Sequence, residues 1–164
     1  MSWSAKAPGL AEHATIELRR ISDVLQVDHA SLFLRDPDRP TDGLCVAETG
    51  RPLCEALREH AMIVKRALCT GRVQEVEPHD GPDGATGAAL ATPLERDGET
   101  FCVLLVVSVR KNRRLGATDA QVIGRAGEIL IERILLAAPR EPRHGVTSDR
   151  FTRAIPPRSP RMRR

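Results

Sequence analysis

Four cysteines are the side chains in this sequence best suited to nucleophilic or redox chemistry. Cys45, Cys54, Cys69 and Cys102 are widely and irregularly spaced, with no Cys-x-x-Cys pair and no His/Cys cluster at zinc-ligand spacing. We therefore expect reduced and mostly buried thiols, with a redox-sensing pair as the alternative. Cys102 lies in an apolar run and should be inert, whereas Cys69, near a predicted helix end, is the better candidate for a responsive thiol.

Histidines and acidic residues offer two further candidate sites. His60 falls on an apolar helical stripe, where it is either a haem-iron ligand or, as we favour, a buried histidine satisfied by one hydrogen bond. His79, Asp80 and Asp83 could bind a cation, but the Gly and Pro residues among them favour an exposed turn. Because no two ligands lie at helical i, i+4 spacing, no metal site is predicted.

Motifs of known catalytic chemistry are missing from the sequence. It contains no P-loop, no Gly-x-Ser-x-Gly and no His-Glu-x-x-His. Catalytic triads are recognised by geometry rather than by sequence order, so motif absence is an argument and not a proof. On this argument we predict that the chain is not an enzyme, and the residues name no cofactor.

The first half of the chain predicts two helices around a hairpin. Apolar steps of three and four predict a helix over 10–27. Short apolar runs at 30–35 and 44–48, separated by turn residues, predict a strand pair with a long loop. Helical spacing returns over 53–69, and Gly71 stands where a C-terminal cap is expected.

The second half predicts more strands and a last helix. Alternation over 73–77 predicts an edge strand, followed by a loop over 78–87. A strand over 88–95 is interrupted by Pro93, which marks an edge or a bulge. The Asp-Gly pair after it predicts a tight turn, and the unbroken apolar run over 101–109 predicts a central strand buried on both faces.

A final helix is expected over 118–138, ended by Pro139. Thr118 and Gln121 have the spacing of a capping box. Gly124 and Gly127 lower helix propensity, and we attribute them to close packing of the first helix, with a dimer contact as the alternative. Adjacent strands joined by short turns, with helices packed on them, indicate an α+β fold with a mainly antiparallel sheet.

Charge is divided unevenly along the 164 residues. The net charge is +3, but residues 139–164 contain eight arginines and two acids, or 8 − 2 = +6, which leaves 3 − 6 = −3 for residues 1–138. We predict a flexible N-terminus over 1–9, one domain over 10–138 and a disordered basic tail over 139–164. The tail could bind nucleic acid or an acidic partner. With no membrane span and no secretory signal, we expect a cytoplasmic protein.

The order of elements and three local phrases resemble the GAF domain family. The phrases are Val-Asp-His-Ala-Ser-Leu-Phe-Leu-Arg-Asp at 27–36, Ala-Leu-Cys-Thr-Gly at 67–71 and Ala-Leu-Ala-Thr-Pro-Leu at 89–94. The resemblance covers about residues 10–137. It implies a twisted antiparallel sheet with the N- and C-terminal helices packed on one face and a ligand pocket on the other.

The resemblance also implies a function. GAF domains bind small molecules or dimerise, and they usually regulate an output domain, which here would act in trans. Lys111-Asn112 reverses the Asn-Lys pair of cyclic-nucleotide-binding members, and Ala120 replaces their Glu, so that ligand is not expected. The short segment 78–87 could cover a small ligand or none. The residues that the resemblance places around a pocket are Arg72, Glu75, His79, Thr86, Ala91 and Thr92.

Four functions follow from these observations. The first is a stand-alone sensory module, expected to be a dimer, that binds a small ligand or a protein partner. The second is a structural dimer or adaptor with a filled pocket. A nucleic-acid accessory protein acting through the tail is the third. The fourth, ranked last, is a thiol-dependent free methionine sulfoxide reductase, because Cys45, Cys54 and Cys69 match no motif of that kind.

Overall fold

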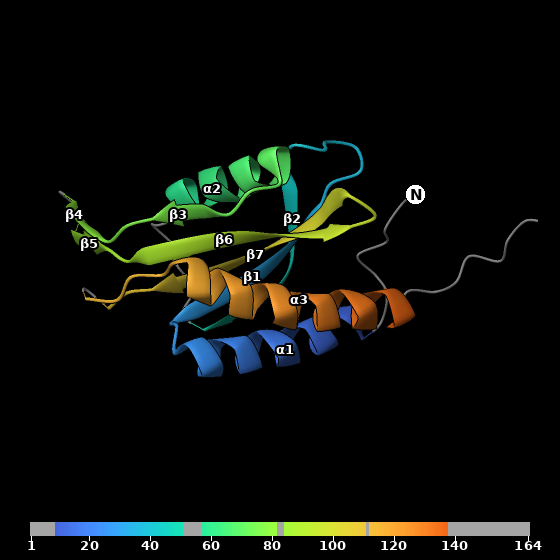
Figure 1. Cartoon of the computed structure of the whole chain (residues 1–164), viewed down its shortest axis with the longest axis horizontal. Helices are drawn as coiled ribbons and strands as arrows, with labels where there is room; N and C mark the ends of the chain where they lie inside the picture. The colour runs from blue at the N-terminus through green and yellow to red at the C-terminus, as the bar shows by residue number, and fades with distance from the viewer. Residues whose placement is uncertain (1–8, 51–56, 82–83, 111, 138–164) are drawn as a thin grey trace, which may run out of the picture.

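The computed structural model describes residues 9–50, 57–81, 84–110 and 112–137. The order of elements along these ranges matches the order expected from the sequence (Figure 1), with one addition. Segment 78–87, expected to be a loop, contains a two-stranded hairpin. The elements are α1 (Leu10–Leu25), β1 (His29–Arg35), β2 (Gly43–Gly50), α2 (Leu57–Thr70), β3 (Gln74–Val76), β4 (His79–Gly81), β5 (Gly84–Thr86), β6 (Ala88–Arg96), β7 (Glu99–Ser108) and α3 (Ala117–Ala137).

The main sheet has five strands in the order β2-β1-β7-β6-β3. Every neighbouring pair is antiparallel. The apolar run at 101–109 forms β7 in the middle of the sheet, where residues 102–108 are buried, so its prediction as a central strand is confirmed. The segment predicted as an edge strand forms β3, and it does lie at one edge. The fold is therefore α+β with an open antiparallel sheet, as expected.

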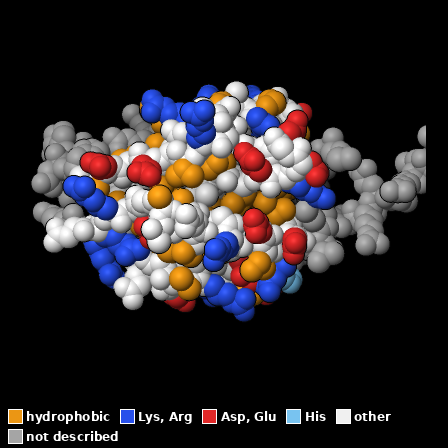
Figure 2. Space-filling model, in the orientation of Figure 1, with side chains coloured by type: hydrophobic (Ala, Val, Ile, Leu, Met, Phe, Trp, Pro, Cys, Tyr) orange, Lys and Arg blue, Asp and Glu red, His pale blue; other side chains and the backbone are white. Residues whose placement is uncertain are grey.

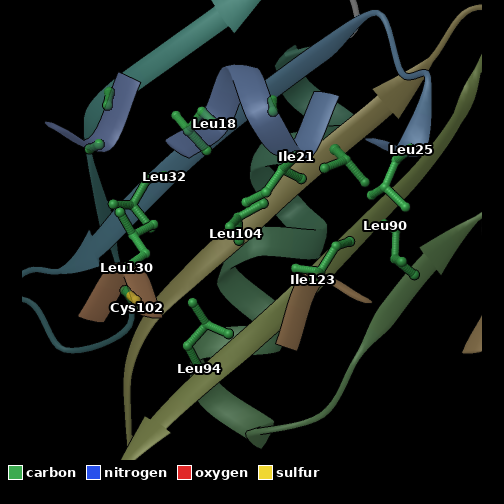
Figure 3. Packing of buried hydrophobic residues seen from close by; sticks show 14 of the residues in the cluster. Leu18, Ile21, Leu25, Leu32, Leu90, Leu94, Cys102, Leu104, Ile123 and Leu130 are labelled. Carbon is green, nitrogen blue, oxygen red and sulfur yellow. The ribbon is translucent and has the colours of Figure 1, made fainter. Parts of the chain in front are cut away.

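Helices cover both faces of the sheet (Figure 1). The first hydrophobic core joins α1 and α3 to one face, and Figure 3 shows Leu18 and Ile123 converging there on Leu104 of β7. The second, smaller core joins α2 to the opposite face through Val64, Leu68 and strand residues of β6 and β7. The predicted packing of the first and last helices on one face is confirmed.

Two expected turns have the backbone geometry that their glycines allow. Asp97 and Gly98 have φ of 55° and 81°, the left-handed pair that closes a two-residue hairpin between β6 and β7. Gly71 has φ of 62°, and its N–H donates to the carbonyl of Ala67 at 2.9 Å, which ends α2. Both predictions are confirmed.

The start of α3 differs from the prediction. The helix begins at Ala117, and the carboxylate of Asp119 accepts the backbone N–H of Gly116 at 3.0 Å. This is the backward half of a capping box, with an aspartate in the third helical position. The expected pairing of Thr118 with Gln121 is wrong, because Thr118 already lies inside the helix.

The two glycines of α3 have different surroundings. A Cβ on Gly127 would meet the side chain of Leu94 in β6, so this glycine allows α3 to approach the sheet. The expected close packing against the first helix is therefore wrong for Gly127. A Cβ on Gly124 would meet nothing within 4 Å.

Pro93 occupies a part of β6 where a missing N–H is tolerated. On one side it is opposite Val103 of β7, while β3 pairs only with Ala89, Leu90 and Ala91 on the other side. The register also shifts between Leu94 and Glu95. Both expected reasons for a proline in a strand, an open edge and a bulge, are present together.

One buried carboxylate ties α1 to α3. Glu17 is 7% exposed and accepts hydrogen bonds from Arg20 at 3.0 Å and from Arg133 of α3. We expect Arg133→Gln to lower the free energy of unfolding by about 1–2 kcal/mol. This is less than a fully buried pair would lose, because Arg133 is half exposed and Arg20 remains as a partner. Urea denaturation measures the change.

The matched control is Arg125→Gln, on the exposed side of the same helix and with no ion pair among the described residues. It should change stability by less than about 0.5 kcal/mol. Adding Glu17→Gln to Arg133→Gln should recover part of the loss, because the buried charge is then removed. Equal effects of the two single changes would contradict the role of the pair.

The predicted flexible N-terminus and basic tail fall almost entirely outside the described residues, so both stay predictions. Among the described helices, none has both the length and the apolar character that crossing a membrane requires.

Candidate functional site

The sheet face beneath α2 carries the buried polar groups that are candidates for ligand contact. Alternate residues of a strand point to opposite faces. Ala30, Leu32 and Leu34 of β1 belong to the core with α1 and α3, so His29 and Ser31 face the α2 side. These two side chains are 5% and 2% exposed.

Ser31 is the residue of this face whose polar group most needs an explanation. Its hydroxyl is buried and has no hydrogen-bond partner among the described residues. Buried polar groups nearly always have a partner, so this hydroxyl is available to a hydrogen-bonding group from outside the protein. His60 is 2% exposed. It lies on the side of α2 that faces the sheet, in line with Val64 and Ala67.

Short side chains lie on β6, separated from Ser31 by strand β7. Along the ladder, Ser31 is opposite Leu105, Leu105 is opposite Ala91, and Ala91 is opposite Gln74 of β3. Ala89 occupies the next position of β6 on this face, and both alanines have 0% exposure. The α2 side of the sheet therefore has polar atoms on β1 and short apolar side chains on β6, with the larger Val103, Leu105 and Val107 of β7 between them.

The C-terminal half of α2 is fixed to the loop between β1 and β2. Arg35 donates to the carbonyls of Pro40, at 2.9 Å, and of Leu68, at 3.5 Å. Lys65 lies 3.5 Å from the carboxylate of Asp42. A Cβ on Gly43 would lie 3.1 Å from the Cβ of Phe33 and 3.3 Å from Leu68. A displacement of α2 would therefore reach β1 through this loop.

The six residues predicted around a pocket do not share one face. Ala91 faces α2, as described above. Thr92 follows it in β6 and alternates to the other face, between Leu90 and Leu94 of the first core. It is 4% exposed, and its hydroxyl has no partner among the described residues.

The remaining four lie toward the β3 edge. Glu75 pairs with Leu90, a residue of the first core, and is exposed. Arg72 is exposed between α2 and β3, and its N–H donates to the hydroxyl of Thr70 at 3.3 Å. His79 and Thr86 are directly opposite each other in the β4–β5 hairpin. That these six form one ligand site stays a prediction.

Sequence reasoning missed His29 and Ser31. Both lie within the phrase at 27–36 that carries the family resemblance, and they are its polar residues at alternate positions in an otherwise apolar strand. That alternation was the available signal. Asp28, just before them, has a structural role, because it accepts the N–H of Val109 at 2.8 Å and so fixes the end of β7.

The described thiols lie on different parts of the fold. Cys102 faces the core with α1 and α3 (Figure 3), and burial raises its pKa to about 12. Cys45 lies on edge strand β2 opposite Phe33, where partial burial of the thiol and then the charge of Glu48 raise its pKa. Cys69 is exposed on α2, and none of these three forms a disulfide. Cys54 lies outside the described residues.

The sequence left two metal-binding alternatives open. One was a haem ligand at His60, and the other was a cation site at His79, Asp80 and Asp83. Asp83 falls outside the described residues. Among the residues that the structure describes, no group of three or more His, Cys, Asp or Glu side chains could hold a metal ion.

Two buried hydroxyls allow a direct test of these assignments. We expect Ser31→Ala and Thr92→Val each to raise the free energy of unfolding of the ligand-free protein by about 1 kcal/mol, because each removes a buried donor without a partner. Urea denaturation after removal of small molecules measures this. Thr70→Val is the control. The Thr70 hydroxyl donates to the carbonyl of Arg66 at 2.8 Å, so its removal should lower the free energy of unfolding. A loss of stability on Ser31→Ala or Thr92→Val would mean that the hydroxyl has a partner.

Similar proteins are found by comparison of structures and not by comparison of sequences. No protein-family model and no curated protein sequence matches the chain. The GAF domain/HD domain protein from Geobacter sulfurreducens matches with a TM-score of 0.57 and 14% identity, over 80% of this chain and 99% of that chain. The second GAF domain of DevS from Mycobacterium smegmatis matches with a TM-score of 0.58 and 17% identity, over 78% and 94%.

An enzyme is also among the similar structures. The free methionine-R-sulfoxide reductase from Neisseria meningitidis, solved with its substrate, has a TM-score of 0.60 and 18% identity, over 80% of this chain and 81% of that chain. A second such reductase, from Thermoplasma acidophilum, matches as well. The prediction that the chain is not an enzyme is therefore corrected: it rested on missing motifs, and solved enzymes share this architecture. At these identities the comparisons establish the architecture, and the chain has a GAF-like fold.

Proposed function

We propose that this chain is a sensory or regulatory module that binds a small molecule between α2 and the sheet. The observation that carries the proposal is the buried Ser31 hydroxyl, which lies on the same side of the sheet as α2 and has no hydrogen-bond partner among the described residues. Ala89 and Ala91 keep the side chains of β6 short on the same face of the sheet. A ligand that offers Ser31 a hydrogen bond would repay the cost of burying that hydroxyl.

The same contacts supply a route for a signal. Ligand occupancy that favours one position of α2 shifts the population of the whole module toward that state. Arg35 and the Lys65–Asp42 pair link α2 to the β1–β2 loop, and β1 contributes side chains to both cores. The response would reach α1 and α3 through β1. Output would then act in trans, on a partner that recognises the changed helix surface.

Native mass spectrometry of the cell-purified protein, repeated under denaturing conditions, tests the proposal. A mass excess that is lost on denaturation identifies a retained ligand by its mass. We expect Ser31→Ala to remove or reduce that excess and Thr92→Val, on the opposite face of the sheet, to keep it. A ligand that both variants retain equally would place binding elsewhere.

A second candidate function is a structural dimer or adaptor. Ile16 and Val24 of α1 and Ile129 of α3 are 43%, 70% and 51% exposed, and these helix surfaces could pack against a second copy of the chain. Size-exclusion chromatography with light scattering would show a dimer. The Val24→Glu variant would elute as a monomer. A dimer without a retained small molecule would favour this function over the first.

A further inference from the structure

Glu48 is the acidic side chain that lies beside Ser31. The two residues are directly opposite each other in the antiparallel pair of β1 and β2, so their side chains share one face of the sheet. The next pair agrees, because Leu32 is opposite Ala47 and both belong to the first core on the other face. Glu48 therefore lies on the α2 side of the sheet, where the Cβ atoms of an opposite pair are about 5 Å apart.

The charge of Glu48 is not compensated by the described residues. Its side chain is exposed and forms no ion pair within the described ranges. Partial burial and then the charge of Glu48 raise the pKa of Cys45 on the same strand, so this carboxylate acts on groups near it. Beside it, the Ser31 hydroxyl is buried and has no hydrogen-bond partner in the part of the chain that the structure describes. An uncompensated carboxylate and an available hydroxyl are therefore neighbours.

The last residue of β2 adds no side chain next to this pair. Gly50 is opposite His29 and has φ of 93°. A Cβ on Gly50 would overlap the carbonyl oxygen of Asp28, so both the backbone conformation and the space require glycine here. No side chain of Gly50 therefore covers Ser31 and Glu48 from this end of β2.

The direction of α2 places its earlier turns toward the same end of the sheet. A Cβ on Gly71, which follows α2, would lie 3.3 Å from the hydroxyl of Thr100. Thr100 lies at the start of β7, whereas Leu105, the partner of Ser31, lies past its middle. The last turn of α2 is therefore at the end of the sheet away from Ser31. The turn with His60, which is 2% exposed, lies toward Ser31.

We propose that the ligand of this face carries a primary ammonium group, held by the Glu48 carboxylate and the Ser31 hydroxyl. This inference rests on the proposed function, since it names the chemical class of the ligand for the same site. An ammonium group has three donors, and carboxylate and hydroxyl oxygens both accept hydrogen bonds. One such group would give Ser31 a partner and compensate the charge of Glu48. A phosphate or carboxylate group at the same place would be repelled by Glu48.

Selection for an ammonium group would come from these local contacts. Figure 2 shows acidic and basic side chains interspersed over the described surface in that view. Mixed charges largely cancel at a distance, and salt screens exposed charges beyond about 10 Å. Glu48 lies well within that distance of Ser31, since the two residues are directly opposite in the ladder. The preference therefore depends on this one carboxylate.

NMR titration of the isotope-labelled full chain with n-butylammonium chloride and with n-butanol, at equal ionic strength and neutral pH, tests the inference. The two molecules have the same alkyl chain, so their difference reports the ammonium group. We expect n-butylammonium to shift the amide resonances of Ser31 and Glu48 with an affinity at least about fivefold above that of n-butanol. Glu48→Gln should remove this preference. Ser31→Ala should weaken n-butylammonium binding about threefold, and no change in that variant would overturn the assignment.

The matched control is Glu99→Gln, at an exposed glutamate that forms no ion pair with a described residue. Glu99 lies about 20 Å along β7 from Leu105, the partner of Ser31, so this change should keep the preference. Equal loss in Glu48→Gln and Glu99→Gln would mean that net charge drives binding, and the inference would be wrong.

Two results with the parent protein would also overturn the inference, and they separate it from the proposed function. Equal affinity for the two compounds would exclude ammonium recognition and leave a small-molecule site at Ser31. If neither compound shifts the Ser31 amide, the ammonium site fails. The retained mass in native mass spectrometry then decides the proposed function separately.

Discussion

Gly87→Ala should lower the free energy of unfolding by about 3 kcal/mol. A Cβ at this position would overlap the carbonyl oxygen of Ser108 and lie 2.7 Å from its carbon and 2.8 Å from the Cα of Val109. These are backbone atoms, so no side-chain rotation relieves the overlap. The hydrogen bond from Val109 to Asp28, at 2.8 Å, also resists movement of this end of β7. Thermal and urea denaturation would both report the loss.

The control for this change is Gly124→Ala in α3. Nothing lies within 4 Å of the Cβ that it adds, so the gain in helix propensity should raise stability by about 1 kcal/mol. Opposite signs for the two substitutions are the expected result. A neutral Gly87→Ala would mean that the junction of β6 with the end of β7 moves freely, contrary to its hydrogen bonds.

Stability should also fall steeply in alkaline solution because of Cys102. Burial raises the pKa of this thiol from 9.0 to about 12, so the folded protein holds its proton over a range in which the unfolded chain releases it. The stabilisation is therefore complete below pH 9 and is lost as pH rises from 9 toward 12. Each pH unit in that window removes up to about 1.4 kcal/mol, or about 4 kcal/mol over the whole window.

Cys102→Ala isolates this effect. It costs stability at pH 7 by leaving a small cavity, but its free energy of unfolding should vary less between pH 8 and 10.5 than that of the parent protein. Cys69→Ala, at an exposed thiol, should keep the parent's slope. The chain has no tyrosine, which removes one other group that titrates in this range. Parallel pH curves for Cys102→Ala and the parent would refute the assignment.

The fold could be predicted from the sequence where local signals agree with the tertiary structure. The apolar run of β7, the Asp-Gly turn and Gly71 at the end of α2 each have one physical interpretation, and each is confirmed. The cap of α3 lies two residues earlier than expected, because the helix begins at Ala117 and Asp119 accepts the N–H of Gly116. Competing caps one or two residues apart cannot be ranked by spacing alone.

The candidate site was less predictable, because it depends on which face of the sheet each side chain occupies. Ala91 and Thr92 are neighbours in sequence and lie on opposite faces. Ser31 is a candidate because its side chain is buried on the α2 side of the sheet, and no local pattern reports that burial. The contact between Gly127 and Leu94 is likewise non-local, since the glycine itself carries no information about its partner.

The strand order also decides when this chain can fold during its own synthesis. β1 lies between β2 and β7, so its second edge stays open until Ser108 has been made. Ribosomes add roughly 5–20 residues per second, so α1, β1, β2 and α2 spend seconds without β7, which contributes side chains to both cores. Nascent chains that end before β7 should therefore be sensitive to protease and dependent on chaperones. Resistance should appear only after the β6–β7 hairpin has emerged.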